Sequence, residues 1–295
     1  MNATIIDGKK VAADIRSQLS REIKKLNAQQ CFPKLEVILV GDNPASKVYV
    51  GMKQKDCEKV GILGQTTTLD KSVEEVELLE LIDQFNKDDS VHGILVQLPL
   101  PNHISENKVI ERISPNKDVD GFHPVNRGKL LAGQDAFVPC TPAGMQELLK
   151  SYDYDPKGKH IVIVGRSGIV GLPFAVLMMQ KKAWANATVT VCHTGSGDLQ
   201  PYTKTADILV AAAGRPKVIT ADMIKPGAVV IDVGVNRVDD PTFDRGYRLV
   251  GDVDFDAVSQ VAGAITPVPG GVGPMTRAML LKNTVTSAKK LCNLL

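Results

Sequence analysis

Short apolar runs rich in β-branched residues alternate with segments of helical periodicity along most of the 295-residue chain. In the first half the clearest runs are LEVILV (35–40) and VHGILVQ (91–97). In the second half the runs cover residues 160–165, 187–192, 207–212 and 228–233. Strands that alternate with helices pair in parallel, because each helix carries the chain back across the sheet. We therefore predict an α/β fold with two α/β domains, each a parallel sheet covered by helices, the second of them Rossmann-like.

Local signals mark helix ends and a domain crossing. Asp7 precedes a run of helical periodicity and is a candidate N-cap. Ser72 and Glu75 have the spacing of a capping box, and four apolar residues are expected on the buried face of the helix that follows: Val73, Val76, Leu79 and Ile82. The turn-rich stretch 114–133 separates the two sets of strands, so we expect the chain to cross between domains there.

Composition excludes several classes of protein. With 35 basic and 33 acidic residues the net charge is +2, which gives no case for a nucleic-acid partner or a membrane surface. No apolar run reaches the roughly 18 residues that span a bilayer, and the start MNATIIDGKK has no apolar signal core, so we expect a cytoplasmic protein. The five cysteines are scattered without a C-x-x-C pair, and the histidines show no metal spacing. We expect neither a disulfide framework nor a metal.

The stretch HIVIVGRSGIVGLP (160–173) joins a predicted strand to a predicted helix through a glycine-bearing turn. Such a turn brings backbone N–H groups and the positive helix end against a phosphate, with room provided by Gly165, Gly168 and Gly171. Ser167 stands where a G-x-G-x-x-G fingerprint has its second glycine. A nucleophile elbow, G-x-S-x-G, is the rival interpretation, but Ile169 occupies its last position.

The end of the next strand, VTVCHTGSGD (189–198), bears on the choice of nucleotide. NAD-binding folds place an acidic residue there for the ribose 2′-hydroxyl, whereas this chain has His193 and Thr194, and Asp198 comes several residues late. A 2′-phosphate would meet no repulsion, and Arg166 can pair with it through charge-assisted hydrogen bonds. NADP is therefore predicted over NAD. The alternative is that Arg166 is a solvated turn residue.

Polar residues of the first half gather where ligands bind in α/β folds. Gln97 follows a predicted parallel strand, and ligands lie at the carboxyl ends of such strands. Tyr49 and Lys53 are four apart and share a helix face. Either Asp118 or Asp120, in NKDVDGFHP, can be a simple turn residue.

Eight stretches carry a resemblance to a known family: GDNPASKVYVGMKQK, ILVQLPLP, SPNKDVDGFHPVNRGKL, PCTPAG, GRSGIVGLP, VIDVGVN, GDVDF and TPVPGGVGPMT. In this order they resemble the bifunctional methylenetetrahydrofolate dehydrogenase / methenyltetrahydrofolate cyclohydrolase family over essentially the whole chain. The resemblance implies a folate-binding catalytic domain (1–139 plus 276–295), an NADP-binding domain (140–275) and a cleft between them. It also implies a C-terminal helix that packs back on the first domain, and a homodimer.

The resemblance assigns roles to individual residues. Lys53 matches the catalytic lysine, Tyr49 the residue that stacks on the folate, Gln97 the glutamine that tunes the lysine, and Asp120 the carboxylate that holds the pterin. The expected folate-binding set adds Val96, Leu98, Pro269, Gly270, Gly271 and Gly273. The expected cofactor-binding set is Thr141, Gly165, Arg166, Ser167, Ile169, His193, Thr194, Gly214 and Val235.

The implied enzyme oxidises 5,10-methylenetetrahydrofolate with NADP+ and hydrolyses the 5,10-methenyl product to 10-formyltetrahydrofolate, a part of one-carbon metabolism that supplies purine biosynthesis. A partly buried Lys53 suits the hydrolysis, because desolvation disfavours a charged amine. Gly195 departs from the family, many members of which have a basic residue there, so more of the 2′-phosphate would fall to Arg166. Two alternatives stay open: another two-domain Rossmann oxidoreductase, and a catalytically silent NADP-binding protein.

Overall fold

The computed structural model describes residues 3–243 and 246–295, which form two compact units. The three-stranded unit contains Ala13–Cys140 and Arg277–Leu295, and the six-stranded unit contains the described residues up to Ala12 together with Thr141–Thr276. This division differs from the predicted domains at the N-terminus. The reason is β1 (Thr4–Ile5), which pairs in parallel with β11 (Ala264–Ile265) and so adds a strand to the larger sheet.

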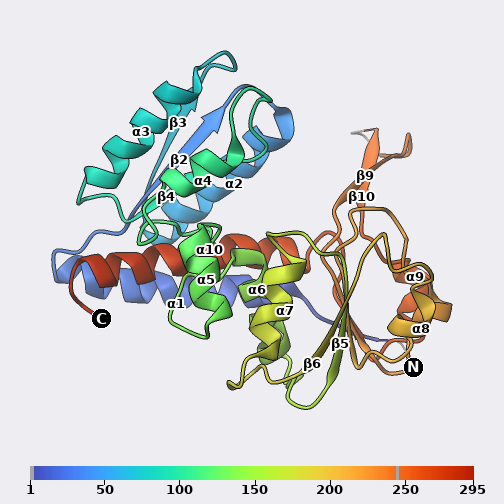
Figure 1. The fold of residues 1–295 in the computed structure, drawn as a ribbon. Coiled ribbons are helices and arrows are strands. Elements are labelled where there is room, and N and C mark those ends of the chain that lie inside the picture. The colour runs from blue at the N-terminus through green and yellow to red at the C-terminus, as the bar shows by residue number, and fades with distance from the viewer. Residues whose placement is uncertain (1–2, 244–245) are drawn as a thin grey trace. The chain divides into compact units, whose positions relative to one another are not determined.

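The three-stranded unit has a parallel sheet with β2 (Lys34–Val40) between β3 (Leu63–Leu69) and β4 (Gly93–Val96). Helices α3 (Glu75–Lys87) and α4 (Glu106–Arg112) cover one face, where Ile38 and Ile94 pack in one core with Leu78 and Ile82 (Figure 1). The unit also holds α2 (Pro44–Val60) and α5 (Pro124–Leu131), together with the larger parts of α1 (Gly8–Ala28) and α10 (Val272–Leu291).

The six-stranded unit is a parallel sheet in the order β1-β11-β8-β7-β5-β6. Its central strands β5 (His160–Val164), β7 (Ile208–Ala211) and β8 (Val229–Asp232) are apolar and buried, as the sequence predicts. The edge strand β6 (Thr188–Cys192) is only partly buried. The remaining elements are α6 (Cys140–Ser151), α7 (Gly171–Met179), α8 (Gln200–Thr203), α9 (Phe255–Val258), the 3₁₀ turn η1 (Ala221–Met223) and the hairpin of β9 (Asn236–Asp239) with β10 (Tyr247–Val250).

Helix ends follow the local signals in part. Oδ1 of Asp7 accepts the N–H groups of Lys9 and Lys10, which confirms the predicted cap of α1. The predicted capping box at Ser72 is wrong, because the Ser72 hydroxyl donates to Asp70 and α3 begins later, with Glu74 as its N-cap. This start also changes the buried face of α3. Val76 is 59% exposed, whereas Leu78 and Ile82 are fully buried.

The stretch 114–133 is not a crossing between the units. It lies wholly within the three-stranded unit and includes α5. The boundary falls later, between Cys140 and Thr141, inside α6. Only the part of the stretch before α5 is irregular, and turn-forming residues are equally suited to a loop that stays within one unit.

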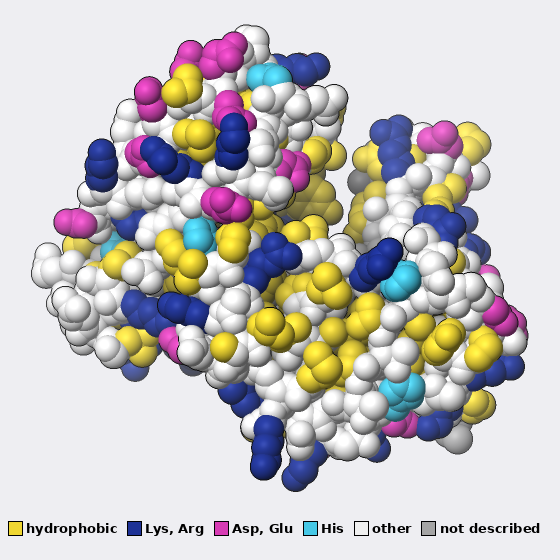
Figure 2. Space-filling model, in the orientation of Figure 1, with side chains coloured by type: hydrophobic (Ala, Val, Ile, Leu, Met, Phe, Trp, Pro, Cys, Tyr) yellow, Lys and Arg dark blue, Asp and Glu magenta, His cyan; other side chains and the backbone are white. Residues whose placement is uncertain are grey.

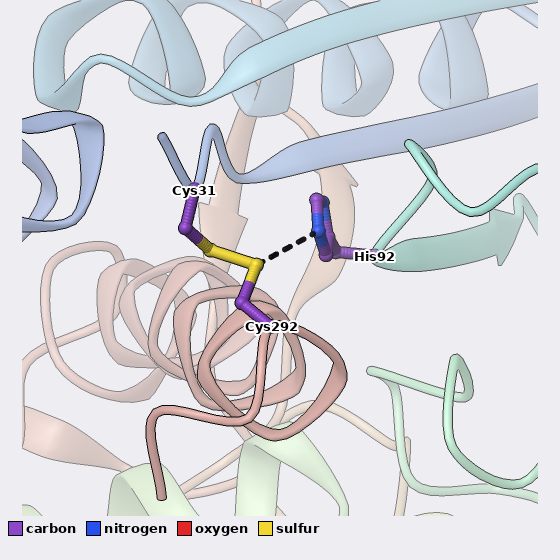
Figure 3. Close-up of side chains that lie close together, drawn as sticks. All are labelled: Cys31, His92 and Cys292. Carbon is purple, nitrogen blue, oxygen red and sulfur yellow. Dashed lines mark hydrogen bonds between the residues drawn. A yellow bond between two sulfur atoms is a disulfide. The ribbon is translucent and has the colours of Figure 1, made fainter. Parts of the chain in front are cut away.

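One cysteine pair corrects the expectation that cysteines form no disulfide. Cys31 and Cys292 are bridged across 261 positions of sequence, with their Cα atoms 6.2 Å apart (Figure 3). Both belong to the three-stranded unit. Cys57, Cys140 and Cys192 are free and buried.

The surface agrees with the near-neutral charge balance. Basic and acidic side chains are interspersed on the face shown in Figure 2. Among the described residues, no helix combines the length and the apolar character needed to cross a membrane.

Candidate active site

Lys53 and Gln97 meet at the carboxyl end of β4. Nζ of Lys53, on α2, donates to Oε1 of Gln97 over 3.0 Å. Gln97 directly follows β4, and its amide nitrogen donates to the carbonyl oxygen of Leu98 over 2.7 Å. The second bond fixes which end of the amide faces the lysine. Helix α2 is itself anchored by Asn43, whose side chain accepts the N–H groups of Ala45 and Ser46, and it ends at the left-handed Gly61.

Asp120 completes this group in the three-stranded unit. The Lys117–Asp118 segment runs beside β4, because the N–H of Ile94 donates to the carbonyl oxygen of Lys117. Burial raises the pKa of the Asp120 carboxyl, while the charge of Lys53 lowers it. This coupling places the carboxyl within electrostatic reach of the lysine. The sequence-predicted trio of Lys53, Gln97 and Asp120 is thus brought together within one unit.

Asp118 and Asp120 have different roles, which resolves the alternative left open by the sequence. The Asp118 carboxylate accepts the N–H groups of Phe122 and His123 and a hydrogen bond from the Asn126 side chain. Asp118 is therefore the turn residue. Asp120 lines a small cavity together with Asp118 and with apolar residues of β4 and α4.

Tyr49 lies one helical turn before Lys53 on α2, and its side chain is 44% exposed. An exposed aromatic ring beside a half-buried polar pair offers a flat surface to a planar ligand. Val96 is buried within β4, and Leu98 is half-buried.

Two residues of α10 that the sequence did not single out support the segments that carry Asp120 and Lys53. The side chain of Asn283 donates to the carbonyl oxygens of Val119 and Val138, which braces the backbone next to Asp120. Arg277 forms an ion pair with the buried Asp56, one turn after Lys53 on α2. A buried carboxylate needs a partner, but neither its burial nor a partner more than 200 positions away is visible in a sequence pattern.

The glycine turn after β5 is sterically required. Gly165 has φ +130°, and a Cβ atom there would lie 2.1 Å from the carbonyl oxygen of Ala212. A Cβ atom on Gly171, the first residue of α7, would lie 2.0 Å from the carbonyl oxygen of Gly165. Oγ of Ser167 accepts the N–H of Val170, so its hydroxyl belongs to the turn. Arg166 and Ile169 are exposed, and within residues 3–243 and 246–295 the Arg166 guanidinium has no hydrogen-bonding or ion-pair partner.

The turn after β6 is closed by its own hydrogen bonds. Nδ1 of His193 accepts the N–H of Gly195, and the N–H of His193 donates to Oγ of Ser196. This arrangement leaves the Thr194 side chain exposed at the carboxyl edge of the sheet, next to the strand that carries Arg166.

Two buried aspartates shape the loops that carry Gly214 and Val235. Asp252 accepts the N–H groups of Ala213 and Gly214, at 2.6 and 2.8 Å, and a hydrogen bond from the side chain of Asn236. Asp232 accepts the N–H groups of Gly234, Asp252 and Val253. Burial raises the pKa of Asp232 to about 6, even though these three bonds lower it. Neither aspartate is marked by a motif in the sequence, although Asp232 ends the buried strand β8 within VIDVGVN.

The loop Pro269–Gly273 belongs to the six-stranded unit, and α10 begins within it at Val272. Gly270 has φ +123° and is buried, as is Gly271, while Pro269 and Gly273 are exposed. Pro269 also lines a cavity of about 400 Å³ with Asp232 and the end of β10. Thr141 is held to Thr276 by a hydroxyl–hydroxyl bond of 2.9 Å.

Comparison with known families shows the family to which the chain belongs. Residues 6–120 match the family described as tetrahydrofolate dehydrogenase/cyclohydrolase, catalytic domain, and residues 139–292 match the corresponding NAD(P)-binding domain. The chain belongs to the tetrahydrofolate dehydrogenase/cyclohydrolase family. The predicted enzyme class is thereby confirmed: a bifunctional, NADP-dependent methylenetetrahydrofolate dehydrogenase and methenyltetrahydrofolate cyclohydrolase.

Relatives match over nearly their full lengths. The bifunctional protein FolD of Bacillus licheniformis is 57% identical over 290 residues, covering 98% of this chain and 99% of its own. The crystal structure of FolD from Campylobacter jejuni is 49% identical, with a TM-score of 0.93 and coverage of 98% and 99%. The Trypanosoma brucei enzyme, solved with NADP and an inhibitor, is 40% identical with a TM-score of 0.92, and 98% of each chain is covered.

Proposed function

We propose that Lys53, Gln97, Asp120 and Tyr49 perform the folate chemistry of this enzyme, and that the turns around Arg166 and Thr194 bind NADP. The observation that carries the proposal is the Lys53–Gln97 hydrogen bond beside the Asp120 carboxyl. On this assignment the three-stranded unit binds the folate and the six-stranded unit binds the cofactor, with the Pro269–Gly273 loop also serving the folate.

In the oxidation the chain positions the substrate. NADP+, when bound, accepts a hydride from the methylene carbon. Asp120 offers two acceptor oxygens to the amino and N–H donors of the pterin, which fixes the orientation of the ring. Tyr49 stacks on the flat aminobenzoate portion. Val96 and Leu98 line the apolar side of the same pocket. Holding the reacting carbon in one orientation supplies the larger part of the rate gain in such a transfer.

The hydrolysis needs proton transfer. Water adds to the methenyl carbon and loses a proton, and the C–N bond to one ring nitrogen then breaks as that nitrogen gains a proton. Lys53 is the group placed to relay these protons. Gln97 orients the amine by accepting a hydrogen bond from it.

The geometry of the two turns supports the proposed cofactor site. The unpaired guanidinium of Arg166 is suited to the 2′-phosphate, with the exposed Thr194 and the His193 turn beside it. Gly165, Ser167 and Ile169 lie in the turn that leads from β5 into α7, and backbone N–H groups before a helix are suited to a pyrophosphate. Thr141, Gly214 and Val235 complete the proposed set toward the nicotinamide.

One assay tests the assignment of both activities. The purified chain is incubated with 5,10-methylenetetrahydrofolate and NADP+, and the absorbance of the methenyl product is followed as it forms and decays to the formyl product. Enzyme-accelerated formation and decay support the proposal. Methenyl accumulation that decays only at the spontaneous rate would leave a dehydrogenase alone and would remove Lys53 from its role.

We further propose a homodimeric, cytoplasmic enzyme whose formyl product feeds purine biosynthesis. Family membership supports the first point, and the near-neutral surface with no membrane-spanning helix among the described residues is compatible with the second. Light scattering during size-exclusion chromatography tests the dimer, since a mass equal to that of one 31.7 kDa chain would contradict it.

A further inference from the structure

One cluster of reactive side chains lies outside the proposed active site. The ligand atoms of Cys31, His92 and Cys292 all lie within 4.8 Å of one another. Figure 3 shows the Cys31–Cys292 bridge with the His92 ring turned toward the Cys292 sulfur. Cys31 and His92 are buried, at 2% and 5% exposure, whereas Cys292 is partly exposed near the end of α10. The cluster therefore has one sulfur that solvent can reach and one that it cannot.

The His92 ring is held in one tautomer. Nδ1 accepts the backbone N–H of Lys34 over 3.2 Å, and the N–H of His92 donates in return to the carbonyl oxygen of Lys34. An imidazole nitrogen that accepts a hydrogen bond carries no proton, so in the neutral ring the proton is on Nε2. Nε2 lies 3.8 Å from Sγ of Cys292, and its N–H is therefore a donor aimed at that sulfur.

This tautomer distinguishes between two uses of the cluster. A metal ion would need the Nε2 lone pair, which requires a proton on Nδ1 and the loss of the Lys34 bond. A sulfur anion on Cys292 needs the N–H that is already there. Burial and the nearby charge of Lys117 lower the pKa of His92, Asp88 acts in the opposite direction, and Lys34 lowers it again, so the ring is neutral near neutral pH.

We propose that Cys31, Cys292 and His92 form a thiol–disulfide redox site that reacts with low-molecular-weight disulfides. In the reduced site the Cys292 thiolate, stabilised by the His92 N–H, attacks a small disulfide RSSR. A mixed disulfide forms on Cys292 and one RS⁻ leaves. The Cys31 thiolate then attacks Sγ of Cys292, the Cys31–Cys292 bond forms, and the second RS⁻ leaves. The two cysteines are oxidised by two electrons, RSSR is reduced to two thiols, and excess small thiol reverses both steps.

Helix α10 connects the bridge to other segments of the three-stranded unit. The residues of this helix that precede Cys292 hold several segments of the three-stranded unit: Asn283 holds Val119, Ser287 donates to the carbonyl oxygen of Asn116, and Lys289 pairs with Glu22 on α1. Closing the bridge ties the last turn of α10 to the start of β2. A cross-link over 261 positions restricts the unfolded chain strongly, so the oxidised form should be the more thermostable.

The other cysteines provide internal controls. Burial raises the pKa of the Cys57 thiol to about 12 and raises the pKa of the Cys140 thiol well above its usual range. Thiols of this kind are poor nucleophiles near neutral pH. Selective reaction at Cys292 would therefore not be a general property of the cysteines in this chain.

The test uses the full-length chain, reduced and then treated with oxidised glutathione. Alkylation and peptide mass spectrometry should show a Cys31–Cys292 cross-link while Cys57, Cys140 and Cys192 remain thiols. The melting temperature should rise by several degrees. Cys31→Ser should stop at glutathionylated Cys292, and Cys292→Ser should leave Cys31 unreacted. A chain that gains neither cross-link nor mixed disulfide would overturn the proposal.

Two further measurements address His92 and the metal alternative. His92→Ala should slow the reaction of Cys292 at pH 7 and shift its rate profile to higher pH, because the thiolate loses its donor. If that variant does not fold, the reaction rate of Cys292 with oxidised glutathione is measured in the folded wild-type chain and in the same chain unfolded by urea. Equal rates would contradict a role for His92 in activating Cys292. Stoichiometric zinc binding by the reduced chain that protects both thiols from alkylation would show a metal site instead.

Discussion

The Gln97 side chain bonds to Lys53 and to its own neighbour at once. Its Oε1 atom accepts from Nζ of Lys53 at 3.0 Å, and its Nε2 atom donates to the carbonyl oxygen of Leu98 at 2.7 Å. Since the amide nitrogen is occupied, the amide cannot turn round and present a donor to the lysine. The lysine is therefore oriented by a neutral acceptor, while burial raises the pKa of the Asp120 carboxyl, which the charge of Lys53 lowers.

Replacing Lys53 by Met should abolish most of the cyclohydrolase activity. Methionine keeps the length and apolar stem of the side chain but cannot carry a proton, so hydrolysis should slow by roughly 10²–10⁴-fold, the usual worth of general acid–base help. NADP binding should persist, because the cofactor residues lie in the other compact unit. Methenyl decay and NADP fluorescence titration measure the two effects.

The neighbouring Lys55 supplies the matched control. It lies on the same helix, two residues later, and is exposed. Lys55→Met should leave both activities close to those of the wild type. Equal losses in the two variants would mean that the helix, rather than the Lys53 amine, is what hydrolysis needs.

Replacing Arg166 by Ala should weaken NADP far more than NAD. Charge-assisted hydrogen bonds are worth about 1.5–3 kcal/mol, so KM for NADP should rise by roughly 10–100-fold. NAD lacks the 2′-phosphate, and its KM should change little. Arg21→Ala, which removes an exposed arginine from α1 in the other unit, is the control. Parallel rises in both KM values would show that Arg166 does not contact the 2′-phosphate.

Local sequence patterns alone predict much of the fold and part of the proposed site. Alternating strands and helices predicted both sheets, and the rule that ligands bind at the carboxyl ends of parallel strands selected Gln97 and the Gly165 turn. These features depend on residues close together in sequence. The resemblance then selected Lys53 and Asp120, which the local patterns alone did not distinguish from an ordinary helix lysine and a turn aspartate.

The features that the sequence did not predict are a helix start, a very short strand and a contact between residues far apart in the sequence. Ser72 does not cap α3 because the helix begins later, at Glu75, with Glu74 at the N-cap position. β1 has only two residues, too few to show a periodicity, yet its pairing with β11 moves the N-terminal segment into the other unit. The Cys31–Cys292 bridge joins residues 261 positions apart, and an odd number of cysteines gives no indication of which two will meet.

Gly165→Ala should unfold or strongly destabilise the nucleotide turn. Alanine disfavours the φ of +130°, and its Cβ atom would lie 2.1 Å from the carbonyl oxygen of Ala212, so the cost should exceed about 2 kcal/mol. Gly128→Ala is the opposite case, since Gly128 is inside α5 with open space around it. That substitution should stabilise the chain by about 0.5–1 kcal/mol. Urea unfolding measures both, and a neutral Gly165→Ala would refute the steric argument.

The buried carboxyl of Asp232 should make stability depend on pH between about 4 and 6. Its pKa is about 6 in the folded chain against an ordinary value of 3.8, so over this range the native state binds more protons than the unfolded state. By linkage, the contribution of Asp232 to the unfolding free energy is fully present below pH 3.8 and is lost as pH rises through about 6, by about 3 kcal/mol in all. The free energy of unfolding is measured at each pH for the wild type and for Asp232→Asn. Subtracting the variant's value from the wild-type value removes the titrations that the two proteins share. This difference should fall as pH rises, and a difference that increases with pH would mean that the three N–H donors outweigh burial and hold the pKa of Asp232 below 3.8.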